Sequence, residues 1–167
     1  QATVSVLDIA DGPDEVAAAL RAALGCEVSV HRVDETYLVS ADVSPETLHA
    51  AVTAHYPQAL IAGFGRDLAV LKGVGHPQAL TEAWGLANAQ GWQGVGQTRM
   101  ATESAVIPAG AHPYAVGPEQ CLVHNGSLSN HNGLRRELVR QGMTFETQND
   151  TEVAAAYVSQ KLKEGQN

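Results

Sequence analysis

A chain of 167 residues, 44% hydrophobic and 17% charged, is long enough for one ordinary domain, or for a small domain with part of another. The formal charge of −8 argues against nucleic acid as a partner, and no apolar run approaches the roughly 20 residues that a membrane span needs. Two cysteines make neither a disulfide framework nor a zinc cluster, so we expect a reducing, cytoplasmic setting and no metal or other cofactor.

The first 62 residues alternate between strand and helix patterns. ATVSVLDI, CEVSVHRV, TYLVSADV and ALIAGFG are rich in β-branched and apolar residues, which favour strands. DEVAAALRAALG and SPETLHAAVTAHYP are expected helices, the first ending at Gly25 and the second opening with Ser44 as its N-cap and Pro45 after it. The order β-α-β-β-α-β predicts a ferredoxin-like module over residues 1–62.

From residue 63 the composition changes, and residues 63–167 form the second predicted domain. We expect strands within GRDLAVLKGVG, WQGVGQTR and CLVHNG, a short extended run at MTFETQ, and an irregular loop at SAVIPAGAHPYAVGPEQ. Helices are expected in HPQALTEAWGLAN, in NHNGLRRELVRQG with Leu134 and Leu138 on its inner side, and in NDTEVAAAYVSQKL with Asp150 at or near its N-cap.

Polar residues gather where two of these expected strands end. His124-Asn125-Gly126 has two interpretations: a sharp turn, or an oxyanion hole in which the Asn125 amide and the Gly126 N–H point at a developing alkoxide. Arg99 is either one half of a surface salt bridge or a bidentate partner for a carboxylate, with Thr102 and Ser104 near it in sequence.

Asp150 is explained fully as a helix cap, but a carboxylate there could also hold a ligand's ammonium group. An arginine for a carboxylate, an aspartate for an ammonium and an Asn/Gly pair for an oxyanion describe a site for an amino acid whose side-chain carbonyl is attacked. The combination is more specific than any of its members.

Four runs carry a resemblance to a known family: GQTRMATES, AHPY, LVHNGSLSNHNGLRREL and FETQNDTEVAAAY. In order and separation they resemble the motifs of class II glutamine amidotransferases, N-terminal-nucleophile enzymes that hydrolyse glutamine and pass the ammonia onward. The resemblance covers about residues 63–163. It is closest to the stand-alone amidotransferase subunits of glutamate-synthase-like and N-methylglutamate-synthase-like complexes.

The resemblance implies a role for each polar residue. Arg99 would hold the glutamine α-carboxylate with Thr102 close by, Asp150 would hold the α-ammonium, Asn125 and Gly126 would form the oxyanion hole, and His124 would orient the turn. The family pattern has His where this sequence has Gln97, which is expected to change the surroundings of the site and not to abolish binding.

The family nucleophile is a cysteine at the mature N-terminus, whose α-amine acts as the base. The chain begins with Gln1, so we expect an upstream segment to supply that cysteine and the chain alone to be inactive. Cys121 adjoins the HNG motif but is expected, like Cys26, to be a small buried hydrophobe.

The fold that the resemblance implies is α+β: a four-layer αββα sandwich lacking its N-terminal strands, with residues 1–62 as an inserted ferredoxin-like module. The expected function is glutamine hydrolysis to glutamate and ammonia for a partner synthase, in a hetero-oligomer. A non-catalytic glutamine-binding or scaffolding relative is the alternative, and a ligand-sensing regulator built on the first module is a third.

Overall fold

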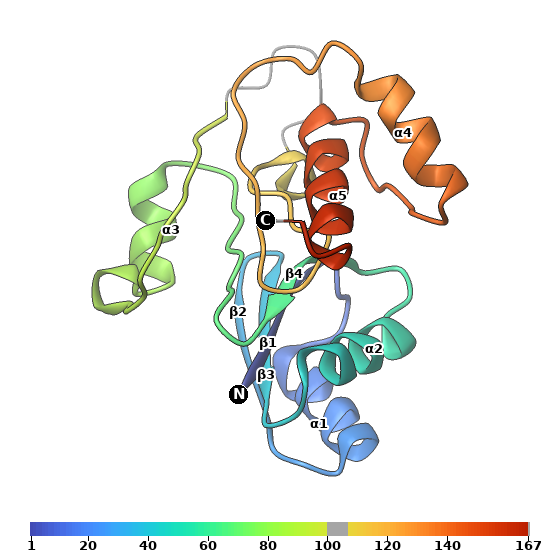
Figure 1. Ribbon diagram of the computed structural model, residues 1–167. Coiled ribbons are helices and arrows are strands. Elements are labelled where there is room, and N and C mark those ends of the chain that lie inside the picture. The colour runs from blue at the N-terminus through green and yellow to red at the C-terminus, as the bar shows by residue number, and fades with distance from the viewer. Residues whose placement is uncertain (100–106, 167) are drawn as a thin grey trace.

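The computed structural model describes residues 1–99 and 107–166. Helices cover one face of a small sheet at one end of the molecule, and two packed helices with long irregular connections occupy the other end (Figure 1). The expected element order of the first module is present, with two helices between the strands as βαββαβ. These elements are β1 (Ala2–Leu7), α1 (Pro13–Leu24), β2 (Val28–Val33), β3 (Thr36–Ala41), α2 (Pro45–His55) and β4 (Leu60–Gly65).

Among the described residues the four strands form one sheet in the order β2-β3-β1-β4. Every neighbouring pair is antiparallel, and β1 lies between β3, where Val4 is opposite Val39, and β4, where the register shifts between Ser5 and Val6. β4 ends at Gly65, so this strand runs past the predicted boundary at residue 62.

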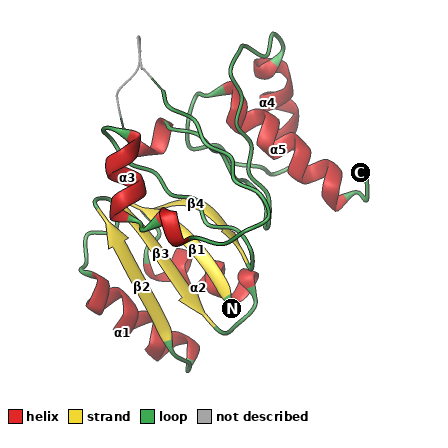
Figure 2. Cartoon of the chain, turned by 90° about the vertical axis from the view of Figure 1, so that its left-hand side faces the viewer, coloured by secondary structure: helices red, strands yellow, loops and turns green. Residues whose placement is uncertain are grey.

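Both helices of the module lie against the same face of the sheet, as Figure 2 shows. Local sequence sets their ends: the Ser44 side chain accepts the Thr47 N–H at 3.1 Å before Pro45, and Gly25 ends α1 in the left-handed region at φ 67°. Burying each Val or Leu side chain of the core beneath them contributes about 1.5–3 kcal/mol. Its fully buried members include Val4, Val6, Val16, Leu20, Val39, Leu48 and Val52.

The chain that follows β4 crosses the opposite face of the sheet. The Val70 N–H donates to the buried Ser5 hydroxyl at 2.9 Å, and the buried Thr36 hydroxyl donates to the Lys72 carbonyl at 2.8 Å. Val70 also packs with Leu7 and Ala62 in a second cluster. These contacts join the second half of the chain to the module.

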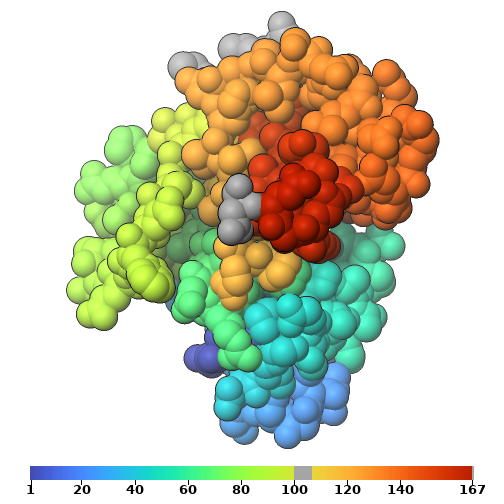
Figure 3. Space-filling view, in the orientation of Figure 1, coloured from blue at the N-terminus to red at the C-terminus, as the bar shows by residue number. Residues whose placement is uncertain are grey.

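The far end of the molecule is built on two helices, α4 (His131–Arg140) and α5 (Asp150–Lys163). Leu138, Val153 and Ala156 form their shared core, with Leu134 packed against it, so the expected inner side of α4 is confirmed. A short helix, α3 (Pro77–Ala83), stands to one side of the molecule, where Figure 3 shows it with its flanking chain. No helix within residues 1–99 and 107–166 is long and apolar enough to cross a membrane.

Several expected strands of the second half are wrong for the described residues. Residues 68–73 and 92–99 are irregular, and the run 121–126 contributes one isolated bridge, Leu122 to Tyr114. A strand needs a neighbour for its backbone groups. In the run 68–73 those groups instead meet side chains, such as Ser5 and Thr36, on the face of a sheet that is already formed.

Candidate functional site

The loop that carries Asn125 and Gly126 leaves the bridge between Tyr114 and Leu122. Backbone bonds of 2.9 and 2.8 Å close that bridge, and both loop residues are exposed. A Cβ added to Gly126 would lie 3.0 Å from Nε2 of His124, so the His124 ring packs closely over this glycine. A side chain at position 126 would therefore crowd the His124 ring.

Asp150 is bound directly to the chain just beyond this loop. Asn149, not Asp150, is the N-cap of α5 and accepts the Thr151 N–H at 2.8 Å. Asp150 is the first helical residue, and its Oδ2 accepts the Leu128 N–H at 2.8 Å. The carboxylate thus fixes the HNG loop beside the beginning of α5.

The surroundings of Asp150 keep its carboxylate charged. Partial burial favours the neutral form and raises the pKa. The Leu128 N–H, the charge of His124 and the hydrogen bonds from Thr151 outweigh burial and leave the pKa below its ordinary value. A carboxylate has about four acceptor positions, so Asp150 can also bind a ligand cation.

His112 lies among the predicted site residues. Its Nε2 lies 2.9 Å from the hydroxyl of Thr151, the residue after Asp150, and its ring meets Tyr114 edge-on at 5.1 Å. Burial lowers its pKa, the positive charges of Lys72, Arg99 and His124 lower it further, and Asp150 opposes them. The imidazole is therefore neutral at pH 7.

Arg99 is joined to His112 through the turn at residues 110–114. Its guanidinium donates from Nη1 to the Gly110 carbonyl at 2.6 Å, and the Tyr114 hydroxyl donates to the same carbonyl at 3.2 Å. Arg99 also lines a pocket of about 330 Å³ with Gln97, Ile107 and residues around α3. Asp150 and the HNG loop do not line this pocket, and Thr102 lies outside the described residues.

The structure brings Asp150 close to the HNG loop and connects Arg99 to it indirectly. Asp150 is bonded to Leu128, two residues after the loop, and Arg99 reaches Thr151, the neighbour of Asp150, through the 110–114 turn and His112. Three buried polar atoms in this region have no hydrogen-bond partner among the described residues: Gln97 Oε1, His112 Nδ1 and His124 Nδ1. Buried polar groups are normally paired, so this region is where a polar ligand would be accommodated.

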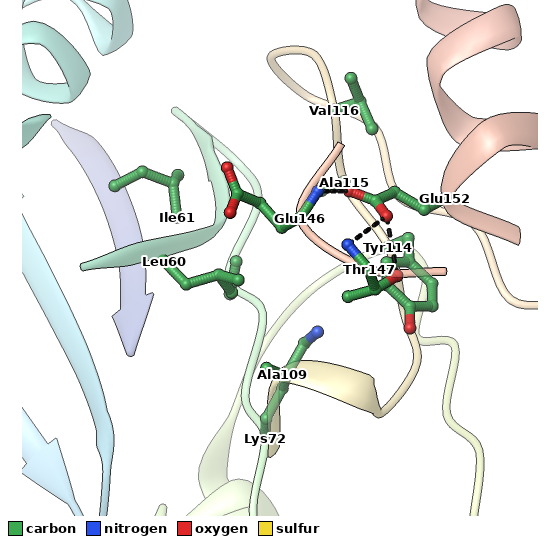
Figure 4. Close-up of a pocket in the computed structure, with 11 residues that line it drawn as sticks. Leu60, Ile61, Lys72, Ala109, Tyr114, Ala115, Val116, Glu146, Thr147 and Glu152 are labelled. Carbon is green, nitrogen blue, oxygen red and sulfur yellow. Dashed lines mark hydrogen bonds between the residues drawn. The ribbon is translucent and has the colours of Figure 1, made fainter. Parts of the chain in front are cut away.

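Two charged residues that the sequence motifs did not point to, Lys72 and Glu152, support the region. Lys72 is 4% exposed, and its ammonium donates to the Ala111 carbonyl at 2.8 Å. Glu152 is 7% exposed and accepts the N–H groups of Glu146 and Thr147 at 2.8 and 2.9 Å (Figure 4). A lysine inside the apolar run LAVLKG is a signal that could have found the first.

Both cysteines are in structural positions. Cys121 packs against the cluster of Leu7, Ala62 and Val70, and burial raises the pKa of its thiol. Cys26 packs against the core of the module. A raised pKa disfavours the thiolate that nucleophilic attack requires, so Cys121 is not activated.

Comparison with known proteins gives the second half of the chain a family resemblance. Residues 97–167 match the glutamine amidotransferase domain family. The chain is 51% identical over 120 residues to the glutamine amidotransferase-like protein GlxB of Rhizobium meliloti (strain 1021), a match that covers 72% of this chain and 40% of that protein. It is 36% identical over 113 residues to glutamine–fructose-6-phosphate aminotransferase (isomerizing) of Thermococcus kodakarensis, covering 65% of this chain and 18% of that enzyme.

This chain thus spans less than half of the length of either relative. No solved structure matches it. The family match begins at Gln97 and includes the Arg99, HNG and Asp150 positions described above. Residues 97–167 are therefore related in sequence to the glutamine amidotransferase domain, in agreement with the motifs.

Proposed function

We propose that this chain forms the glutamine-recognition part of a class II glutamine amidotransferase, which hydrolyses the side-chain amide of glutamine. The observation that carries the proposal is the hydrogen bond from the Leu128 N–H to Asp150, which fixes the HNG loop beside a charged carboxylate. The family match over residues 97–167 supports glutamine as the ligand.

In this proposal each polar group meets one part of glutamine. Asp150 binds the α-ammonium, and the planar fork of Arg99 binds the α-carboxylate. The side-chain carbonyl then lies toward Asn125 and Gly126, whose N–H donors would stabilise the oxyanion. The resemblance places Thr102 near the carboxylate and His124 behind the loop, where it packs over Gly126.

The proposed reaction consists of two acyl transfers, first to a cysteine and then to water. A cysteine thiolate attacks the amide carbon, and the α-amine that took the thiol proton passes it to the amide nitrogen. The tetrahedral oxyanion then collapses, ammonia leaves and a thioester remains. Water then cleaves the thioester, so glutamine and water give glutamate and ammonia. The resemblance assigns the nucleophile to an N-terminal cysteine, and neither Cys26 nor Cys121 has the setting for that role.

The finer assignments extend the same proposal. The ammonia would pass to a partner synthase in a hetero-oligomer, as in glutamate-synthase-like complexes. Residues 63–167 would be part of an αββα sandwich, and residues 1–62 a ferredoxin-like module within it. The strand order β2-β3-β1-β4 supports the second assignment, and the sandwich rests on the family resemblance.

Glutamine hydrolysis by the full-length gene product tests the proposal. Arg99→Ala should raise KM for glutamine by about tenfold or more with kcat nearly unchanged, because it removes charged hydrogen bonds made before and during reaction. Asn125→Ala should instead lower kcat by roughly 10²–10³ with a modest change in KM. Arg136→Ala, at an exposed position of α4, is the matched control and should behave as the parent.

Two outcomes would contradict these assignments. A parent-like kcat in Asn125→Ala would remove the oxyanion role of this residue. If the full-length protein bound glutamine in calorimetry but released no glutamate, the non-catalytic alternative would replace hydrolysis.

A further inference from the structure

Lys72 is a buried cation that the proposed reaction does not use. It belongs to the segment that crosses the sheet, far in sequence from the residues proposed to bind glutamine. Its backbone carbonyl accepts a hydrogen bond from the Thr36 hydroxyl. Its side chain is 4% exposed and extends away from the sheet toward the 110–114 turn. A buried ammonium is costly unless it is paired, so its contacts indicate what it does.

Two contacts join the Lys72 ammonium to the 110–114 turn among the residues that the structure describes. It donates to the Ala111 carbonyl at 2.8 Å, and it lies 5.0 Å from the centre of the Tyr114 ring. Figure 4 shows it pointing into a cavity of about 40 Å³, with Tyr114 and the first turn of α5 on the far side. A charged donor on a carbonyl makes a stronger hydrogen bond than a neutral one, so Lys72 is a main support of this turn.

The same turn holds both ends of the glutamine site. Gly110, just before Ala111, accepts the Arg99 guanidinium, and His112, just after it, pairs with Thr151 next to Asp150. A displacement of Ala111 would therefore change the separation between the groups assigned to the α-carboxylate and the α-ammonium. Loss of this spacing would prevent glutamine from meeting both charged groups at once, and so weaken its binding.

We propose that Lys72 is a positioning residue for glutamine, whose bond to Ala111 sets the spacing between Arg99 and Asp150. This inference rests on the proposed function and adds to it a residue from outside residues 97–167, the range of the family match. Lys72 acts through the 110–114 turn and does not touch the substrate.

The ionisation of Lys72 gives the proposal a pH signature. Burial lowers its pKa to about 8, while the carboxylate of Glu152 on α5 opposes that change. Glu146 and Tyr114 also line its cavity, and His112 interacts with its charge from the turn. Because the pKa is lowered, the ammonium and its stronger bond are present below about pH 8 and are lost as the pH rises through that value.

The experiment measures steady-state glutamine hydrolysis by the full-length protein between pH 6.5 and 9.5, a range of about 1.5 pH units on either side of the lowered pKa. Lys72→Met, which keeps the apolar stem, should raise KM by about tenfold or more at pH 7 and leave kcat within about threefold. Lys72→Arg keeps the charge at every pH used and should hold KM near the parent value at pH 7. The parent should show a larger alkaline rise in KM than Lys72→Arg. Titration of glutamine itself affects both proteins equally, so the difference between the two profiles reports the ionisation of Lys72.

Lys163→Met, at an exposed position near the end of α5, controls for the loss of a lysine. A parent-like KM in Lys72→Met, or an alkaline KM profile in Lys72→Arg that superimposes on the parent, would overturn the inference. The Lys72→Arg comparison stands even if Lys72→Met does not fold. Absence of hydrolysis in the parent would instead refute the proposed function, so the two failures are distinguishable.

Discussion

At the scale of single residues, the charged groups of the candidate site are defined by what surrounds them. Asp150 is held anionic chiefly by the Leu128 N–H against the effect of burial, and His112 is held neutral by burial and by the charges of Lys72 and Arg99. Lys72 is buried, and burial lowers its pKa to about 8. Several groups with shifted pKa values in one region are typical of sites that bind or transform ligands.

Asp150 gives a prediction on stability. Its pKa is lowered in the folded state, so its charge stabilises the fold fully above the unfolded value of about 4, and this contribution disappears as the pH falls through the lower folded value. Asp150→Asn keeps the shape but not the charge. The parent should therefore be the more stable protein at pH 7, and the difference should shrink toward pH 3.

Urea unfolding of both proteins at several pH values measures this difference. Stability curves that stay parallel from pH 7 to pH 3 would mean that the carboxylate gains nothing from Leu128 and His124. Asp14→Asn, at an exposed position in the first turn of α1, serves as the control for removal of one acidic group.

At the scale of elements, the important joint is the one between the sheet and the chain that follows it. The segment 66–73 has no strand partner, and it is attached through the Ser5 and Thr36 side chains and through Val70. The turn at residues 117–120 is attached to the same region, since the Glu119 carboxylate accepts the N–H groups of Arg66 and Asp67. Hydrogen bonds to side chains therefore attach this segment to the sheet, in place of the backbone hydrogen bonds that a neighbouring strand would make.

Ser5→Ala tests this joint. Its hydroxyl is fully buried and accepts the Val70 N–H, so the substitution leaves that N–H unpaired and should lower the free energy of unfolding by about 1–3 kcal/mol. Ser29→Ala, in the exposed part of β2, should change it by less than about 0.5 kcal/mol. Equal effects of the two substitutions in thermal or urea unfolding would show that the Ser5 bond does not hold the segment.

At the scale of the whole molecule, stability is distributed unevenly. The module has a continuous buried core between its sheet and helices, whereas residues 89–96 are exposed and irregular, with Trp92 94% exposed. The α4–α5 pair has a core of its own, built on Leu138, Val153 and Ala156. Regions with many buried apolar contacts open least often.

Hydrogen exchange followed by mass spectrometry measures this distribution. Amides of the central strands β1 and β3 should exchange most slowly, those of α5 at intermediate rates, and those of residues 89–96 fastest, because the last are exposed and outside regular structure. Protection of residues 89–96 equal to that of β1 would contradict this order. The same measurement with glutamine added should slow exchange around Leu128 if the proposed site is occupied.

The sequence by itself determined the elements of the first module and pointed to the candidate site residues. Alternating apolar residues, the Ser44–Pro45 start and the Gly25 stop are local signals, and local signals specify where helices and strands form. The polar residues of the TRMAT, HNG and NDTEV motifs could be singled out because together they describe an amino-acid site, although each alone has another explanation.

Only the tertiary structure decided how the second half is arranged. Whether a strand-like run such as 121–126 joins a sheet depends on a neighbour that local sequence does not specify, and here it formed a single bridge. The contact of the buried Lys72 with Ala111 likewise depends on segments 39 residues apart, and the bond from Leu128 to Asp150 on segments 22 residues apart. Charges acquire shifted pKa values and ligand-binding geometry only when such long-range contacts remove them from water, which is why the folded chain and not the sequence pattern sets them.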